Sequence, residues 1–178
     1  MRKELGKPTR ELFFRRLGEV APKFQRCGIY DIKGFTWSFL NQDKNLYQWI
    51  CFQRHKYENA FTIELAWRLS AGDPCEVVFD APTKSFSHKG NRFRLGGLWG
   101  NQRDYWWYVT DPLPDISTAS MEDYLQMCIA PPEIDIEKAL PRIHAVVDDA
   151  ISRIQNHALP YFEKVSEWVV QQDITDDK

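Results

Sequence analysis

Three segments in the first half of the chain, all within residues 34–69, alternate apolar and polar side chains. In the first segment, Phe35, Trp37 and Phe39 occupy every second position, which is the period of a strand with one buried face. Residues 46–54 are typical of a second, longer strand. The third segment repeats the alternation, and β-branched and aromatic residues favour a strand there as well: Phe61, Ile63, Leu65 and Trp67.

Polar links and shorter apolar runs extend this pattern. Residues 41–45, Asn-Gln-Asp-Lys-Asn, favour a turn, so the first two strands are predicted to form a hairpin. Residues 75–80 are a candidate fourth strand. In residues 91–95, Phe93 and Leu95 are expected to point one way and Arg92 and Arg94 the other. Residues 104–109 predict a last strand with aromatic side chains on both faces, either central or lining a groove.

The segment before the strands has the pattern of a helix. Pro8 and Thr9 are expected to open it, and apolar residues then recur at helical spacing. Pro22 should kink or interrupt the helix, and Cys27-Gly28 is expected to end the segment, since glycine accepts the geometry that follows a helix end. The basic residues between them are read as a solvated face, with anion binding as the alternative.

After residue 111 the periodicity becomes helical to the end of the chain. Ser120 and Asp123 resemble a capping box that opens a short helix over 121–129. Asp135 is the expected N-cap of a long helix, with Pro141 tolerated near its start and Pro160 breaking the pattern before a second short helix. The apolar stripe of the long helix comprises Ile136, Leu140, Ile143, Val147, Ile151 and Ile154.

Grouped strands with helices before and after them indicate an α+β fold. We expect an antiparallel sheet of about five strands, with an N-terminal helix and C-terminal helices packed on it. A chain of 178 residues is most economically one domain, spanning 1–178, with a core over about 9–170 and a polar, frayed tail over 171–178.

Composition narrows the classes of function. A net charge of -2 argues against general polyanion binding, although a local basic patch stays open. The four cysteines are scattered without a Cys-x-x-Cys spacing, which fits free thiols in a reducing cytoplasm. No run approaches the ~18 to 20 apolar residues of a membrane span, so we expect a soluble cytoplasmic protein without membrane contact.

Few residues suggest catalysis or metal binding. His144 and Asp148 share one face of the long helix, but no third ligand is recognisable, and an exposed polar face is the simpler interpretation. His55 and His88 lack a nucleophile in a familiar context. The Gly96-Gly97 pair lacks the rest of a phosphate loop. We therefore expect no metal, no cofactor and no assigned catalytic residue.

A set of arginines, aromatic residues and one glutamine is the candidate binding site. Arginines interleaved with tryptophans on a sheet can bind bases, phosphates or a carboxylate-bearing protein surface. The alternative is a structural cation–π arrangement without a ligand. The set comprises Gln53, Arg54, Arg68, Arg92, Arg94, Trp99, Arg103, Trp106 and Trp107.

The ordered motifs of the strands are similar to those of domain-of-unknown-function family 4304. They are Phe35-Thr36-Trp37, Ile50-Cys51-Phe52-Gln53-Arg54, Phe61-Thr62-Ile63-Glu64-Leu65, Arg94-Leu95-Gly96 and Asp104-Tyr105-Trp106-Trp107. The resemblance covers roughly residues 9–168, and departs from the family pattern at Glu64, where asparagine is frequent, and in the loop 81–90. It implies a bacterial α+β domain with no assigned reaction, of a kind frequent among immunity and accessory proteins.

Three functions follow from these observations. The first is a non-enzymatic binding protein that holds a protein partner, such as a toxin-neutralising immunity or accessory protein. The second is a nucleic-acid or nucleotide-binding module that uses the same arginines and tryptophans. The third is an enzyme with a site around His144, Asp148 and Glu64, or around Arg92 and Arg94.

Overall fold

The computed structural model describes residues 1–27, 36–43, 45–69, 90–99, 105–111, 120, 122 and 134–176, without the side chains of Lys3 and residues 172–176. Its helical elements are α1 (Lys3–Val20), the 3-10 turn η2 (Leu95–Leu98), α3 (Ile136–Arg153), a π-helical segment (Ile154–Ala158) and α4 (Leu159–Asp176). Its strands are β1 (Gln25–Arg26), β2 (Thr36–Asp43), β3 (Leu46–Arg54), β4 (Ala60–Arg68), β5 (Asn91–Arg94) and β6 (Trp107–Tyr108).

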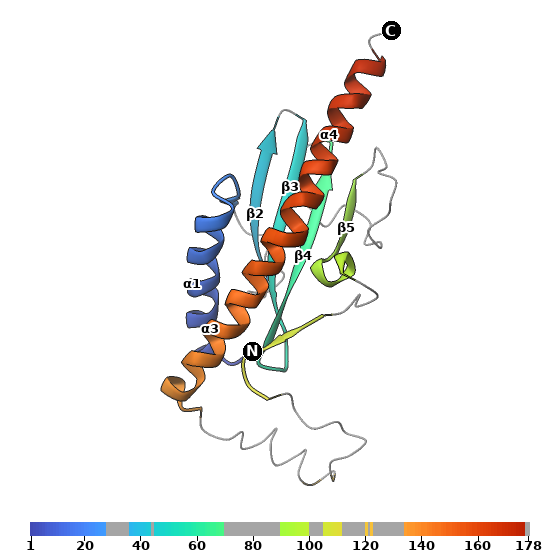
Figure 1. Ribbon diagram of the computed structural model, residues 1–178. Coiled ribbons are helices and arrows are strands. Elements are labelled where there is room, and N and C mark those ends of the chain that lie inside the picture. Colours follow the sequence, from blue (N-terminus) through green and yellow to red (C-terminus); the bar gives the residue numbers. More distant parts are fainter. Residues whose placement is uncertain are drawn as a thin grey trace.

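The described strands form one antiparallel sheet. Their order is β1-β2-β3-β4-β5, and β6 pairs with β4 beside its first residues. The β2–β3 hairpin is confirmed, although its strands run further than the sequence suggested, so that Asp43 pairs with Leu46. The α+β fold, with helices before and after an antiparallel sheet, is as the sequence predicts (Figure 1).

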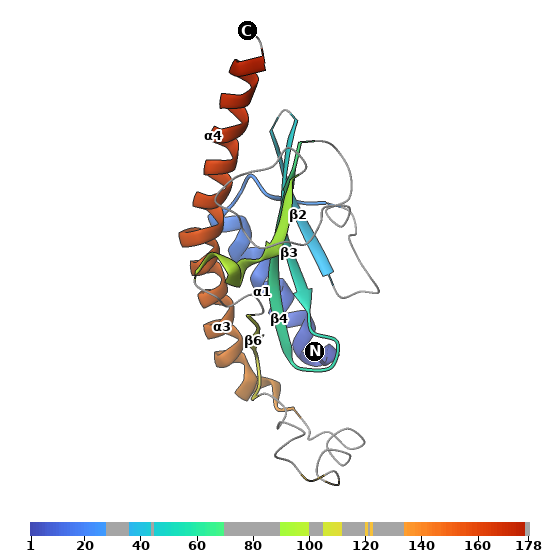
Figure 2. The same cartoon turned by 90° about the vertical axis from the view of Figure 1, so that its right-hand side faces the viewer.

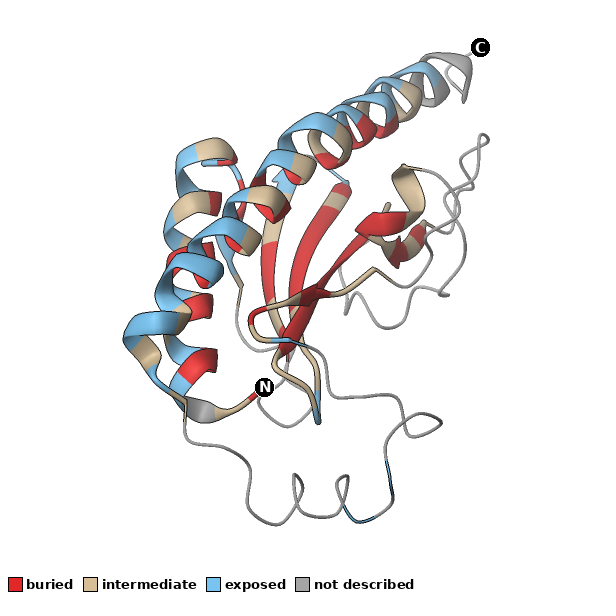
Figure 3. Ribbon diagram, turned by 60° about the horizontal axis from the view of Figure 1, so that its bottom comes forward, coloured by how far each residue is buried: buried red, intermediate tan, exposed pale blue. Residues whose placement is uncertain are grey.

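The helices lie on one side of the sheet (Figure 2). Strand side chains alternate between the two sides, so one set faces α1, α3 and α4, and we call this the helix face. Phe13 of α1 contacts Phe39, Phe52 and Phe61 there, with ring centroids 5.0 to 6.4 Å apart. The buried positions of the helices point toward the sheet in Figure 3. The main apolar core therefore lies between the helices and this face.

Helix α1 begins earlier than the sequence suggested. Pro8 and Thr9 lie inside the helix, which starts at Lys3. Leu5 is fully buried, and the Thr9 hydroxyl donates to its carbonyl oxygen at 2.7 Å. Packing of the first turn therefore outweighs the backbone hydrogen bond that Pro8 removes. The helix ends at Val20, so it is interrupted before Pro22 as the sequence allowed, but its expected continuation to Cys27 is wrong, because Gln25 and Arg26 form β1.

The prediction that Pro160 breaks the C-terminal helix is wrong. Helices α3 and α4 are joined by the π-helical segment into one rod, which passes beyond the sheet in Figures 1 and 2. A π-helical turn is wider than an α-helical turn, and Pro160 follows it at the second position of α4, where its missing N–H is tolerated. Helical structure reaches Asp176, within the expected polar tail.

The start of α3 matches its prediction. Asp135 is the N-cap, and its carboxylate accepts from the N–H groups of Glu137 and Lys138 at 3.1 and 3.3 Å. Most of the predicted stripe is buried, but Leu140 is 38% exposed. Leu140 lies in the second turn, ahead of the buried positions that begin at Ile143.

The strand expected over 104–109 is only two residues long, because β6 pairs with β4 through Trp107 and Tyr108 alone. Among the described strands β6 pairs with β4 alone, so it is an edge strand of the described sheet. The candidate strand over 75–80 lies outside the described residues, as does the helix over 121–129 except for Glu122. Within the part of the chain that the structure describes, no helix is long and apolar enough to cross a bilayer.

Candidate functional site

The second face of the sheet, which points away from the described helices, carries buried polar side chains. Thr36, Ser38, Thr62 and Glu64 are each no more than 4% exposed. A small apolar group, Trp49, Cys51 and Ala66, lies beside them, and no helix residue belongs to it. Burial of polar groups is costly unless hydrogen bonds replace those made to water. The hydrogen bonds of such residues therefore show which interactions hold the second face together.

The most buried charge on this face belongs to Glu64. Its side chain is 5% exposed, and Oε2 accepts from Arg92 Nη2 at 2.8 Å and from Nε at 3.1 Å. The two residues lie on neighbouring strands, because Glu64 is in β4 and Arg92 in β5. A charge-assisted pair of this kind compensates for the desolvation of the carboxylate. Arg92 therefore has a structural role.

Arg94 belongs to an aromatic cluster beside the first half of β4, near the β3–β4 turn. Its guanidinium carbon lies 4.8 Å from the ring centroid of Trp106. His55, from the β3–β4 turn, meets Trp106 edge to face at 4.7 Å, and Tyr57 meets His55 at 6.3 Å. Tyr57 is 75% exposed, whereas the other three residues are half-buried. We call these four residues the arginine–aromatic patch.

His55 is held as a neutral acceptor within the patch. Its Nδ1 accepts from the N–H groups of Glu58 at 2.9 Å and Tyr57 at 3.4 Å, which requires that nitrogen to carry no proton. Burial lowers the pKa of His55, and the positive charge of Arg94 lowers it further. The β3–β4 turn is thereby fixed beside Trp106.

Two other predicted residues lie at the margins of the second face. Gln53 is half-buried and pairs across the sheet with Thr62, and its buried Oε1 atom has no hydrogen-bond partner among the described residues. Arg68 is half-buried at the end of β4, opposite Tyr47. Arg103 lies outside the described residues.

The remaining predicted residues lie on the helix side. Trp107 is buried, and its indole Nε1 donates to Asp149 of α3 at 2.8 Å. Trp99 lies beneath the Arg153 guanidinium at 4.5 Å. Arg54 has the parity of Phe52, beside α1. Period-two alternation separates Arg54 and Trp107 from Arg92, Arg94 and Trp106, and the η2 turn carries Trp99 to the helix side, so the predicted residues do not share one face.

The pair formed by His144 and Asp148 on α3 is not part of a catalytic or metal site among the described residues. His144 is exposed, and Asp148 lies 3.2 Å from Arg16 Nε of α1. Among the described residues, no group of three or more His, Cys, Asp or Glu side chains could hold a metal ion. The buried Cys51 thiol is 3.3 Å from the Ser38 hydroxyl, and burial raises its pKa to about 12, so it is a poor nucleophile at neutral pH.

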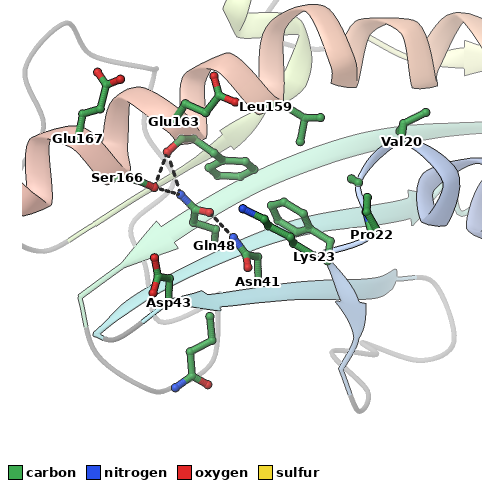
Figure 4. A pocket seen from close by; sticks show the side chains of 14 residues that line it. Val20, Pro22, Lys23, Asn41, Asp43, Gln48, Leu159, Glu163, Ser166 and Glu167 are labelled. Carbon is green, nitrogen blue, oxygen red and sulfur yellow. Dashed lines mark hydrogen bonds between the residues drawn. The ribbon is translucent and has the colours of Figure 1, made fainter.

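The sequence did not predict a groove that lies beside the β2–β3 turn, at the end of the hairpin away from the arginine–aromatic patch (Figure 4). It has a volume of about 770 Å³ and lies between the end of α1, the hairpin and α4. Gln48 forms its floor: Oε1 accepts from Asn41 Nδ2 at 2.9 Å, and Nε2 donates to the Phe162 carbonyl at 2.9 Å and to the Ser166 hydroxyl at 3.2 Å. These bonds fix the sheet to α4.

One position in the sequence could have indicated this groove. Gln48 is a polar residue at a helix-face position, between Leu46 and Ile50, where the alternation calls for an apolar side chain. A polar residue at such a position predicts a hydrogen-bonding partner across the core. The partner, on α4, is more than a hundred residues away along the chain.

Comparison with known proteins finds no matching family model, no matching curated protein and no matching solved structure. The similarity to family 4304 therefore stays a prediction.

Proposed function

We propose that this protein is a non-enzymatic binding protein that recognises a partner protein through the arginine–aromatic patch. The observation that carries the proposal is the unbroken series of contacts from exposed Tyr57 through His55 and Trp106 to Arg94. Tyrosine, tryptophan and arginine are the residue types that dominate the energetics of protein interfaces.

The patch suits recognition because its side chains are already ordered. Arg94 is held over an indole ring, and His55 is held by two backbone N–H groups. A guanidinium and rings that are fixed before binding lose little conformational freedom on association. Large aromatic surface is available at Tyr57, which projects from the turn.

The charge of the patch favours an acidic partner surface. Lys56 lies 4.8 Å from the Tyr57 ring centroid and is exposed, so it adds a second cation at the Tyr57 end of the patch. Opposite potentials across an interface accelerate association and suppress wrong partners. In the bacterial setting that the resemblance to family 4304 implies, the partner is a toxin or a larger assembly, and the protein acts in immunity or as an accessory subunit.

Affinity capture from the native cytoplasm tests the proposal. Wild type is compared with an Arg94→Ala/Trp106→Ala variant in low and moderate salt, and protein and nucleic acid are identified in each eluate. We expect one protein to be retained by wild type only, and its purified form to bind the variant at least tenfold more weakly, since hot-spot truncations cost roughly 2 kcal/mol or more.

Arg10→Ala is the matched control, because Arg10 lies over Trp37 at the same 4.8 Å but on α1, away from the patch. It should bind like wild type. Equal binding by wild type and the patch variant, with both folded by circular dichroism, would overturn the proposal. Recovery of nucleic acid that is lost as salt rises would replace it with the nucleic-acid function.

A further inference from the structure

The groove between α1, the β2–β3 hairpin and α4 has acidic side chains that no ion pair among the described residues neutralises. Its acidic side chains are Asp43, Glu163 and Glu167, all exposed, and Lys23 is the basic residue that lines it. None of these three carboxylates forms an ion pair within the described part of the chain. The groove is therefore negatively charged and available to a cation.

Two of the carboxylates repel each other. Glu163 and Glu167 are four residues apart on α4, so they share one helix face and stand at the same rim of the groove (Figure 4). A like-charged pair at this spacing destabilises a helix. A bound cation between them would remove that repulsion, which favours a basic ligand.

The α1 side of the groove is apolar. Val20 and Pro22 lie there, at and just after the end of α1, and Leu159 adds an apolar side chain on the same face of α4 as Glu163. Beneath them the rings of Phe24 and Phe162 are 5.5 Å apart. An apolar wall beside carboxylates suits a lysine or arginine side chain, whose carbon stem packs on the wall while its charge reaches the rim.

The size and shape of the groove favour a peptide over a small ion. Its volume of about 770 Å³ far exceeds a hydrated metal, and its carboxylates come from both the hairpin and α4. Its floor, Gln48, is hydrogen-bonded to Asn41 and Ser166, so it is rigid. The edge of β2 at residues 41–43 also lines the groove, past the two residues that β1 covers.

We propose that this groove binds a lysine- or arginine-bearing segment of a partner protein, with an apolar side chain of that segment against Val20 and Leu159. The site is separate from the arginine–aromatic patch and opposite to it in charge. It does not depend on the function proposed for the patch.

A linear peptide library displayed on phage provides the test. Selection on wild type, with counter-selection on Glu163→Lys/Glu167→Lys, should enrich sequences that pair basic residues with one apolar residue. Synthetic peptides from that pool are then titrated by fluorescence anisotropy. We expect at least tenfold weaker binding to the charge-reversed variant, and binding to wild type that weakens as salt rises.

Glu122→Lys/Glu137→Lys is the control, because both glutamates are exposed outside the groove and the net charge changes equally. It should bind the peptides like wild type. Enriched peptides without basic residues, or equal loss in the control, would overturn the proposal. So would a wild-type dimer that Glu163→Lys/Glu167→Lys dissociates in ultracentrifugation, since the occupant would then be a second copy.

Discussion

The two faces of the sheet are both buried, but they are buried by different chemistry. On the helix face, Ile50 and Phe61 are fully buried among apolar side chains of α1 and the α3–α4 rod. On the second face, Thr62 and Glu64 are almost as inaccessible, yet the Thr62 hydroxyl donates to the Tyr105 carbonyl and Glu64 accepts from Arg92. The stability of the helix face depends on how well its side chains fill the core volume. The stability of the second face depends on whether each buried polar group keeps its hydrogen-bond partner.

The largest effect should come from removing volume on the helix face. Phe61 stacks on Phe52 at 4.8 Å and on Trp107 at 5.4 Å. Phe61→Ala should lower the free energy of unfolding by about 3–5 kcal/mol, because the cavity cannot fully collapse. Urea denaturation measures it. Phe61→Leu is the matched control and should cost clearly less, whereas a loss below about 1 kcal/mol in Phe61→Ala would contradict a volume-dependent face.

The second face should respond to the loss of one partner. Glu64→Leu removes the carboxylate that accepts from Arg92, and we expect a loss of about 2–4 kcal/mol in urea denaturation. The double variant Glu64→Leu/Arg92→Leu should recover most of that loss, since replacing a buried pair by apolar residues is often nearly neutral. A double variant less stable than the single one would show that volume dominates this face too.

The helix face contains a polar contact of its own, with a smaller expected effect. Trp67 Nε1 donates to the Tyr161 hydroxyl at 3.0 Å, so Tyr161→Phe should cost about 1 kcal/mol at neutral pH. Burial raises the pKa of Tyr161 to about 12, above its usual 10.0. Between those values the unfolded chain loses this proton first, so wild-type stability should fall as pH rises.

Urea midpoints at pH 8, 10 and 11 measure this alkaline loss. Tyr161→Phe keeps the other tyrosines, so its midpoint should fall less steeply over the same range. Parallel curves for the two proteins would mean that Tyr161 titrates normally in the fold.

Thiol reactivity should show how tightly the second face is closed, because Cys27 packs at the margin of the group that contains Cys51. In a background with Cys75 and Cys128 replaced by serine, half-buried Cys27 should react with Ellman's reagent first. Cys51, whose pKa is raised to about 12 by burial, should react only as fast as the protein unfolds. Equal rates for the two thiols in the folded protein would show that the second face opens readily.

The strands of the sheet could be predicted because each one is specified by the alternation of residues within its own segment. Alternation placed Phe39, Ile63 and Trp67 on one face, and the opposite directions of Arg92 and Phe93 are confirmed by their exposure. The N-cap at Asp135 also needed only three neighbouring residues. Each of these patterns is a direct consequence of the period of its own element.

Features that depend on distant packing were not predictable. Pro8 looked like a helix start because the burial of Leu5, which extends α1, is a tertiary contact. Trp107 was grouped with Trp106, although neighbouring strand residues point to opposite faces. The groove draws its lining from three separate stretches of the chain, which no single period connects.

The π-helical segment between α3 and α4 sets the rotational phase of the groove. Such a segment is equivalent to one residue inserted into an α-helix, and each residue turns a helix by about 100°. Deleting a residue such as Asn156 would straighten the hydrogen-bond ladder but rotate α4, carrying the Phe162 carbonyl away from Gln48 and both glutamates off the rim. Insertions and deletions here would therefore re-aim the binding surface while leaving the sheet intact.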